Sequence, residues 1–192
     1  MSSARADAAP GRVRIIGGRL RGSRLAVADA PGLRPTPDRV RETLFNWLAP
    51  IVEGARCLDL YAGTGALGIE ALSRGAASVD FVEADARRAD ELRANLARLK
   101  QAAAVHRGDA LVFIAAHEGV YDLVFLDPPF DADAWAAAAL ALERHARLAA
   151  HAVVYVESPR TLAPELPANW TVHREGHAGA VRYALYRRSI KL

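Results

Sequence analysis

A glycine-rich loop between an apolar strand and a helix is the feature that most constrains the fold of this chain. The apolar segment 57–61 is predicted to be a buried strand, and a helix is predicted over 67–73. Between them, Gly63, Gly65 and Gly68 follow the spacing Gly-x-Gly-x-x-Gly. Glycines there permit a tight turn and let a ligand lie against bare backbone. The pattern predicts an adenosine-containing cofactor above the first strand of an α/β sheet.

The rest of the chain after residue 55 continues this alternation of strands and helices. Further strands are predicted over 78–82, 105–106, 121–126 and 152–156, with helices over 84–100, 109–116 and 133–149. Two final strands, 170–174 and 181–187, have no helix between them. We therefore predict a Rossmann-like, seven-stranded, mostly parallel sheet that ends in an antiparallel hairpin.

The segment before this domain has a different organisation. We expect a strand over 13–16, a turn at Gly17 and Gly18, and a returning strand over 19–27. Thr36 is predicted to cap a helix whose first residue is Pro37 and which Pro50 stops. We divide the chain into a disordered tail (1–10), a hairpin-helix extension (11–50) and a catalytic domain (51–192).

Charge is concentrated in the same N-terminal segment. Residues 1–47 hold nine arginines and four acidic residues. This imbalance favours an anionic partner, although a solvated arginine-rich face would give the same count. No apolar run approaches the roughly 20 residues of a membrane span. With the single cysteine Cys57 and six histidines without ligand spacing, we predict no metal site, and we expect a cytoplasmic monomer.

Three carboxylates near the glycine loop refine the cofactor. Asp59 ends the strand before the loop, where it would repel a pyrophosphate and attract a sulfonium and an α-ammonium group; alternatively it caps loop N–H groups. Glu83, twenty residues after Gly63, can accept both ribose hydroxyls. Asp109 can bind an adenine amine, cap the following helix, or both. The predicted cofactor residues are Asp59, Tyr61, Gly63, Thr64, Gly65, Gly68, Glu83, Asp109 and Ala110.

The tetrapeptide Asp127-Pro128-Pro129-Phe130 follows the apolar strand 121–126. The prolines end the strand and hold the Asp127 carboxylate and the Pro128 carbonyl at the sheet edge. An exocyclic base amine is a weak nucleophile, and two acceptors can bind its protons, turn its lone pair and stabilise the developing charge. Phe130 can stack on an extruded base. These four residues are predicted to be catalytic. The predicted reaction is the transfer of a methyl group from S-adenosylmethionine to that amine.

These motifs resemble those of known methyltransferases. Asp59 to Gly65 is similar to the cofactor loop of class I methyltransferases, and Asp127 to Phe130 to their amino-methylating branch. Residues 15–22, 32–48, 63–74 and 155–158 more closely resemble the RsmD family of bacterial 16S ribosomal RNA guanine-N2 methyltransferases. The resemblance covers nearly all of the chain after residue 11, and the block from Arg34 to Leu48 distinguishes this family.

The resemblance implies that the target is one guanine of 16S ribosomal RNA, near the decoding region in the head of the small subunit. It also implies that the substrate is a partly assembled subunit. The basic residues predicted to contact RNA are Arg19, Arg21, Arg24, Arg34, Arg39 and Arg41. One of the last three can instead pair with Asp38 or Glu42.

Three other functions are compatible with parts of the sequence. An NAD-dependent oxidoreductase would explain the glycines and Glu83 but leaves Asp59 and the Asp-Pro-Pro-Phe motif unexplained. A DNA amino-methyltransferase would share both motifs, but the chain has little room for a region that reads duplex sequence. A non-catalytic RNA-binding module is disfavoured because every expected catalytic position is filled.

Overall fold

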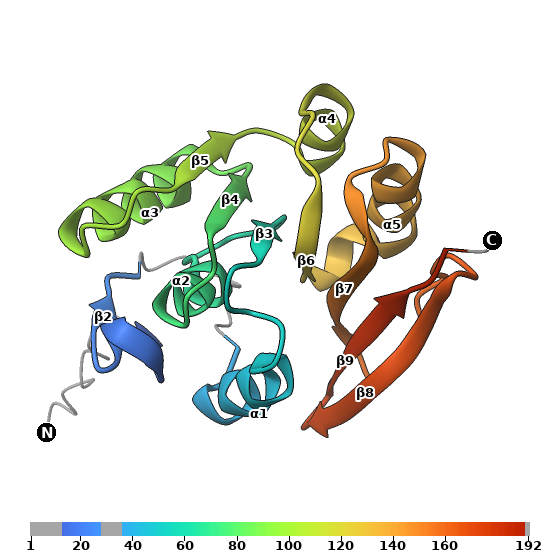
Figure 1. The fold of residues 1–192 in the computed structure, drawn as a ribbon, viewed down its shortest axis with the longest axis horizontal. Coiled ribbons are helices and arrows are strands. Elements are labelled where there is room, and N and C mark those ends of the chain that lie inside the picture. The colour runs from blue at the N-terminus through green and yellow to red at the C-terminus, as the bar shows by residue number, and fades with distance from the viewer. Residues whose placement is uncertain (1–12, 28–35, 191–192) are drawn as a thin grey trace, which may run out of the picture.

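The computed structural model describes residues 13–27 and 36–190, which contain a seven-stranded sheet with the order β5-β4-β3-β6-β7-β9-β8 (Figure 1). Strands β3 to β7 are parallel, and β9 pairs antiparallel with β7 and β8. This arrangement confirms the predicted sheet and its antiparallel end. The strands are β3 (Arg56–Asp59), β4 (Ser78–Glu83), β5 (Ala104–Arg107), β6 (Tyr121–Leu126), β7 (Leu148–Pro159), β8 (Trp170–Ala178) and β9 (Val181–Arg188).

Helices cover both faces of the sheet. One face carries α1 (Asp38–Leu48), α2 (Ala66–Ser73) and α3 (Ala86–Arg98); the other carries α4 (Ala110–Ala116) and α5 (Trp135–Arg144). Successive residues of a strand point to opposite faces, so Phe125 packs on the first side and Leu126 on the second. None of the helices in the described ranges is long and apolar enough to cross a membrane.

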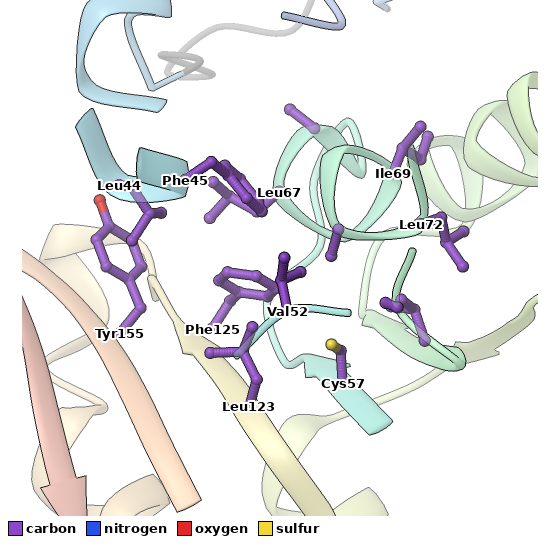
Figure 2. Packing of buried hydrophobic residues seen from close by; sticks show 14 of the residues in the cluster. Leu44, Phe45, Val52, Cys57, Leu67, Ile69, Leu72, Leu123, Phe125 and Tyr155 are labelled. Carbon is purple, nitrogen blue, oxygen red and sulfur yellow. The ribbon is translucent and has the colours of Figure 1, made fainter. Parts of the chain in front are cut away.

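The N-terminal extension shares the hydrophobic core of the sheet. Figure 2 shows Leu44 and Phe45 of α1 lying over Phe125 of β6 and Tyr155 of β7. The Phe45 and Phe125 ring centroids are 6.0 Å apart. Because the side chains of α1 complete this core, the extension folds together with the sheet.

The predicted N-terminal hairpin exists but is much shorter than expected. β1 (Val13–Arg14) pairs with β2 (Arg24–Leu25), and a 3₁₀ turn (η1, Gly18–Leu20) stands where the returning strand was predicted to start. The reason is that α2 takes the backbone groups of the connection. The carboxylate of Glu70 accepts the N–H groups of residues 16 and 17, and Ser73 accepts that of residue 20.

Two predicted helix boundaries are wrong. α1 begins at Asp38 with Pro37 as its N-cap, so Thr36 does not cap it; the Thr36 hydroxyl instead donates to Glu157 Oε2 at 3.2 Å. The helix predicted over 133–149 is α5, which ends at Arg144. Ala146 adopts a left-handed φ of 53°, and β7 then starts at residue 148 to pair with the beginning of β6.

A buried carboxylate fixes the extension to the catalytic domain. Glu70 of α2 is fully buried; Oε2 accepts the Ile16 N–H and Oε1 the Gly17 N–H, both at 2.8 Å, and Arg74 Nε donates to Oε1 at 2.9 Å. The buried Arg41 guanidinium lies 3.8 Å from Oε2. Glu70 therefore supplies both the hydrogen-bond acceptors and the negative charge that this contact region requires.

We expect Glu70→Ala to lower the free energy of unfolding by about 3 kcal/mol, because it leaves two backbone donors and Arg74 Nε without their acceptor and removes a negative charge beside the buried Arg41. Urea denaturation measures this change. Glu118→Ala, which alters an exposed glutamate, should stay within about 0.5 kcal/mol of the unaltered protein. Equal losses for the two variants would contradict the anchoring role.

Candidate active site

The glycine loop joins β3 to α2, as predicted. Gly63 and Gly65 adopt φ values of 53° and 76°, a left-handed conformation that favours glycine. A Cβ atom at Gly65 would lie 2.3 Å from Leu92 Cδ1, and one at Gly68 would lie 2.2 Å from the Phe81 ring. Gly65 thus shapes the turn, and Gly68 lets α2 pack closely on the sheet. Thr64 lies between the two turn glycines and is half-buried.

Asp59 is the last residue of β3 and lies beneath this loop. Its side chain is 3% exposed, and Oδ2 accepts the Gly68 N–H at 3.0 Å. Burial raises the pKa of the Asp59 carboxyl to about 7, against the lowering effect of the Gly68 N–H and with a further increase from the charge of Glu83. The capping role that the sequence left open is therefore present, and it leaves Oδ1 for a ligand as far as the described residues show.

Glu83 ends β4, the neighbouring strand. Its Oε2 accepts the Gly63 N–H at 2.8 Å, and its Oε1 accepts the Asp85 N–H at 2.8 Å. These bonds hold both oxygens in a fixed orientation at the carboxyl edge of the sheet. Each oxygen keeps a lone pair for a second donor. The geometry fits a carboxylate that binds two adjacent hydroxyl groups.

Asp109 follows β5 and caps α4. Its Oδ1 accepts the N–H groups of Leu111 and Val112 at 2.8 and 3.0 Å, so the predicted capping role is confirmed. Ala110, the first residue of α4, is buried. Tyr61 lies close enough for burial and the Asp109 charge to raise the pKa of its phenol to about 12. A ligand group between Tyr61 and Asp109 would meet the Tyr61 ring and Asp109 Oδ2, to which none of the described residues donates.

The Asp-Pro-Pro-Phe motif follows β6 at the same edge. Pro128 is buried, whereas the Phe130 ring is 42% exposed and lies in a 3₁₀ turn (η2, Phe130–Ala132) with its centroid 6.0 Å from that of Trp135. Burial raises the pKa of the Asp127 carboxyl well above its usual range, and the charges of Glu157 and Asp59 add to the increase. The motif thus lies within electrostatic range of the cofactor loop.

Glu157 is a carboxylate that we did not predict as a site residue. It lies on β7 and is 7% exposed; Oε2 accepts the hydroxyls of Tyr155 at 2.8 Å and Thr36 at 3.2 Å. The sequence carries a signal for it, since Glu157 follows the apolar segment 152–156 as Asp127 follows β6. Burial raises the pKa of the Glu157 carboxyl, and its two hydroxyl donors oppose that increase.

The predicted RNA-binding arginines differ in their exposure. Arg19, Arg21, Arg24 and Arg39 are exposed, whereas Arg34 lies outside the described residues. The prediction for Arg41 is wrong. Its side chain is 1% exposed, Nη2 donates to Asp38 Oδ1 at 2.6 Å and Nε donates to the Thr36 carbonyl at 3.2 Å. Among the predicted arginines that the structure describes, Arg41 is therefore the one that pairs with Asp38, which also accepts from Arg14 at 3.4 Å.

Comparisons with known proteins agree with this geometry. The family model described as "Conserved hypothetical protein 95" matches residues 13–187. Ribosomal RNA small subunit methyltransferase D of Escherichia coli K12 is 50% identical over 180 residues, 93% of this chain and 91% of its own length. The solved E. coli structure of yhhF is 49% identical, with a TM-score of 0.85, and covers 94% of this chain and 100% of that one. SMU.776, solved with SAH, is 13% identical with a TM-score of 0.70 over 96% of this chain and 58% of its own, a likeness of fold.

The sheet order, the glycine loop and the carboxylates at its edge define the class I methyltransferase fold. Within that class, the extent of the family match and the 50% identity assign a narrower group. The chain belongs to the RsmD family, which includes the curated ribosomal RNA small subunit methyltransferases D.

Proposed function

We propose that this protein transfers a methyl group from S-adenosylmethionine to the exocyclic N2 of a guanine in 16S ribosomal RNA, within an assembled or partly assembled small subunit in the cytoplasm. The observation that carries the proposal is the position of Asp127 to Phe130 at the same sheet edge as Asp59 and Glu83. The names of the related proteins support a small-subunit ribosomal RNA as substrate. The guanine and the assembled substrate rest on the family resemblance.

The residues at this edge fit S-adenosylmethionine. Glu83 would bind the ribose hydroxyls, Asp109 the adenine amine and Asp59 the ammonium group, while Gly63 and Gly65 leave the backbone free of side chains. A dinucleotide pyrophosphate would meet the carboxylates of Asp59 and Glu83 directly at the glycine loop, which disfavours an oxidoreductase. When bound, the cofactor supplies an electrophilic methyl group on a good leaving group, so the protein needs no covalent nucleophile.

The chain's own contribution is to orient and polarise the amine. In the proposed complex, Asp127 and the Pro128 carbonyl accept hydrogen bonds from the two N2–H groups, which turns the nitrogen lone pair toward the methyl group. As the nitrogen–methyl bond forms and the sulfur–methyl bond breaks, N2 becomes positively charged and then loses one proton, to the Asp127 carboxylate or to water. The exposed ring of Phe130 stacks on the base after it leaves its helix or loop. Alignment of the nitrogen with the methyl group provides most of the rate increase.

Cofactor affinity should depend on pH through Asp59. The Asp59 carboxyl has a pKa of about 7 in the free protein, and a cationic ligand favours its ionised form. The affinity for the cofactor is therefore highest above this pKa. Below it, the affinity falls as the pH decreases, by about tenfold per pH unit. Calorimetric titrations with S-adenosylmethionine between about pH 5.5 and 7.5 measure the slope. Asp59→Asn should bind more weakly with a nearly flat profile; an unchanged slope would assign the titration to another group.

Binding to small subunits should depend on salt through the exposed arginines. Arg39 is exposed in the first turn of α1, which covers one face of the sheet. Arg144 is exposed on α5, which covers the opposite face. We expect Arg39→Gln to reduce the slope of log affinity against log salt by about 1 if it contacts one phosphate. Arg144→Gln is the matched control and should leave the slope unchanged. Filter binding at several salt concentrations measures both; a slope near zero for the unaltered protein would contradict an arginine-based RNA interface.

The proposed function is tested by transfer of labelled methyl groups from S-adenosylmethionine. Small subunits from a strain without this activity are compared with protein-free ribosomal RNA and with duplex DNA, and the product is identified by nucleoside mass spectrometry. N2-methylguanosine from the subunits alone supports the reaction, the base and the assembled substrate. Label in DNA alone would instead support a DNA amino-methyltransferase, and no label in any substrate would contradict methyl transfer.

A further inference from the structure

Two carboxylates, Asp127 directly after β6 and Glu157 near the end of β7, are neighbours across the sheet. β6 and β7 are parallel, and Leu126, the last residue of β6, is paired with Val156, so the residue after each of them is a carboxylate, and the backbones of neighbouring strands lie about 4.8 Å apart. Phe125 and Tyr155 point to the face covered by α1. Because side chains alternate along a strand, Asp127 and Glu157 belong to that same face. Burial and the charge of Glu157 both disfavour the ionised form of Asp127.

The contacts of Glu157 fix which oxygen is available to a ligand. Its side chain is 7% exposed, and two hydroxyl groups donate to the same oxygen, Oε2: Tyr155 at 2.8 Å and Thr36 at 3.2 Å. The Trp135 indole N–H donates to the Glu157 carbonyl at 2.7 Å, which also holds the backbone. None of the residues in 13–27 and 36–190 donates to Oε1. Glu157 is thus a nearly buried, rigid carboxylate, and within the described ranges one of its oxygens is left for a donor.

The proposed substrate carries a donor that Asp127 and Pro128 do not satisfy. A guanine that leaves its pair exposes the N1–H next to the N2 amine, and a buried donor without an acceptor costs about 1–3 kcal/mol. We propose that Glu157 Oε1 accepts the N1–H of the target guanine, while Asp127 accepts a proton of the adjacent N2 amine. This inference rests on the proposed function and names the residue that selects the base.

The same geometry discriminates against the bases of DNA amino-methyltransferases. Adenine at N1 and cytosine at N3 carry a lone pair beside the amine instead of a proton. A carboxylate oxygen there would face that lone pair, which is repulsive. Guanine, in contrast, presents N1–H and N2–H to the two neighbouring carboxylates, and these donors also reduce the repulsion between the two negative charges.

The experiment uses a base that lacks the O6 oxygen of guanine and therefore also lacks its N1 proton. Once mass spectrometry has located the modified guanine, small subunits are reconstituted with 2-aminopurine at that position. 2-Aminopurine keeps the 2-amino group, but its N1 is an acceptor. The unaltered protein should methylate guanine with a kcat/KM about 10- to 100-fold above that for 2-aminopurine, since one contact becomes repulsive. Equal values for the two bases would overturn the inference without the need for any variant.

The variant Glu157→Gln should reverse the preference. The Tyr155 and Thr36 hydroxyls would keep the amide oxygen at the Oε2 position, so the NH₂ group would replace Oε1 and face the base. We expect kcat/KM for guanine to fall about 100-fold, while the value for 2-aminopurine stays equal or rises. An equal decrease for both bases would overturn direct recognition, because a merely structural role lowers both alike. Glu165→Gln, an exposed glutamate after β7, is the matched control and should leave both values unchanged.

Failure of the inference differs from failure of the proposed function. If the unaltered protein methylates guanine in the subunits but shows no preference over 2-aminopurine, only the role of Glu157 is wrong. If it methylates no guanine in any substrate, the proposed function falls, and the role of Glu157 falls with it.

Discussion

Replacing Asp127 by alanine is expected to lower kcat for methyl transfer by about 10³-fold while the dissociation constant for S-adenosylmethionine stays within about threefold of its original value. Asp127 follows β6 and belongs to the base side of the site, whereas the predicted cofactor contacts lie after β3, β4 and β5. The lost carboxylate would act mainly on the transition state, where the amine becomes positively charged. Such an interaction appears in kcat and leaves cofactor binding almost unaffected.

Steady-state assays with saturating subunits and cofactor measure kcat, and calorimetry measures cofactor binding. Asp90→Ala removes an exposed aspartate of α3 and should change neither quantity. Asp127→Asn, which keeps one acceptor but not the charge, should fall between alanine and the unaltered protein. Turnover by Asp127→Ala at a rate near the original would refute the proposed mechanism.

The parts of the site that could be predicted from the sequence are those in which the functional residues are neighbours in the chain. The glycine loop, Asp59 and the Asp-Pro-Pro-Phe motif each follow an apolar strand, and the parallel sheet brings the ends of those strands to one edge. Strand identity alone therefore places Asp59, Glu83, Asp109 and Asp127 close together. No knowledge of long-range contacts was needed for these residues.

The environments of the residues that the sequence misjudged are decided by elements far away in the chain. Thr36 looked like a helix cap, but its hydroxyl is 121 positions from its acceptor, Glu157. Arg41 looked like part of a basic surface, but Glu70 and the Thr36 carbonyl hold it in the interior. Charge counts cannot distinguish an exposed arginine from a buried one. Only the packing of α1 against α2 and β7 decides the environment of these side chains.

The N-terminal strands and the end of α5 show a second limit of prediction from the sequence, namely that local propensity does not fix the bounds of an element. Local propensity predicted a long hairpin over 13–27, but Glu70 and Ser73 take hydrogen bonds that a hairpin would need. Likewise the alanine-rich segment favours helix beyond Arg144, yet the pairing of Tyr121 with Leu148 requires strand. In both places tertiary hydrogen bonding outweighs helix or strand propensity, which is worth less than about 1 kcal/mol per residue.

The second large effect is expected from Glu83→Ala, which should raise the dissociation constant for S-adenosylmethionine by about 100-fold. In the proposed complex the two Glu83 oxygens accept the ribose hydroxyls, and the loss of hydrogen bonds to a charged group costs about 3 kcal/mol in total. The variant also releases the Gly63 and Asp85 N–H groups that shape the loop. At saturating cofactor, kcat should remain within about tenfold of its original value, because Asp127 and Phe130 are untouched.

Calorimetry and methyl transfer at high cofactor concentration measure the two effects of Glu83→Ala separately, and urea denaturation shows whether the loop has also lost stability. Glu118→Ala, an exposed glutamate before β6, serves as the control and should bind the cofactor normally. Glu83→Ala and Asp127→Ala should thus give opposite patterns, a loss of affinity in one and a loss of turnover in the other. If Glu83→Ala instead binds the cofactor with unchanged affinity, the ribose is bound elsewhere, and the role of Glu83 is restricted to holding Gly63 and Asp85.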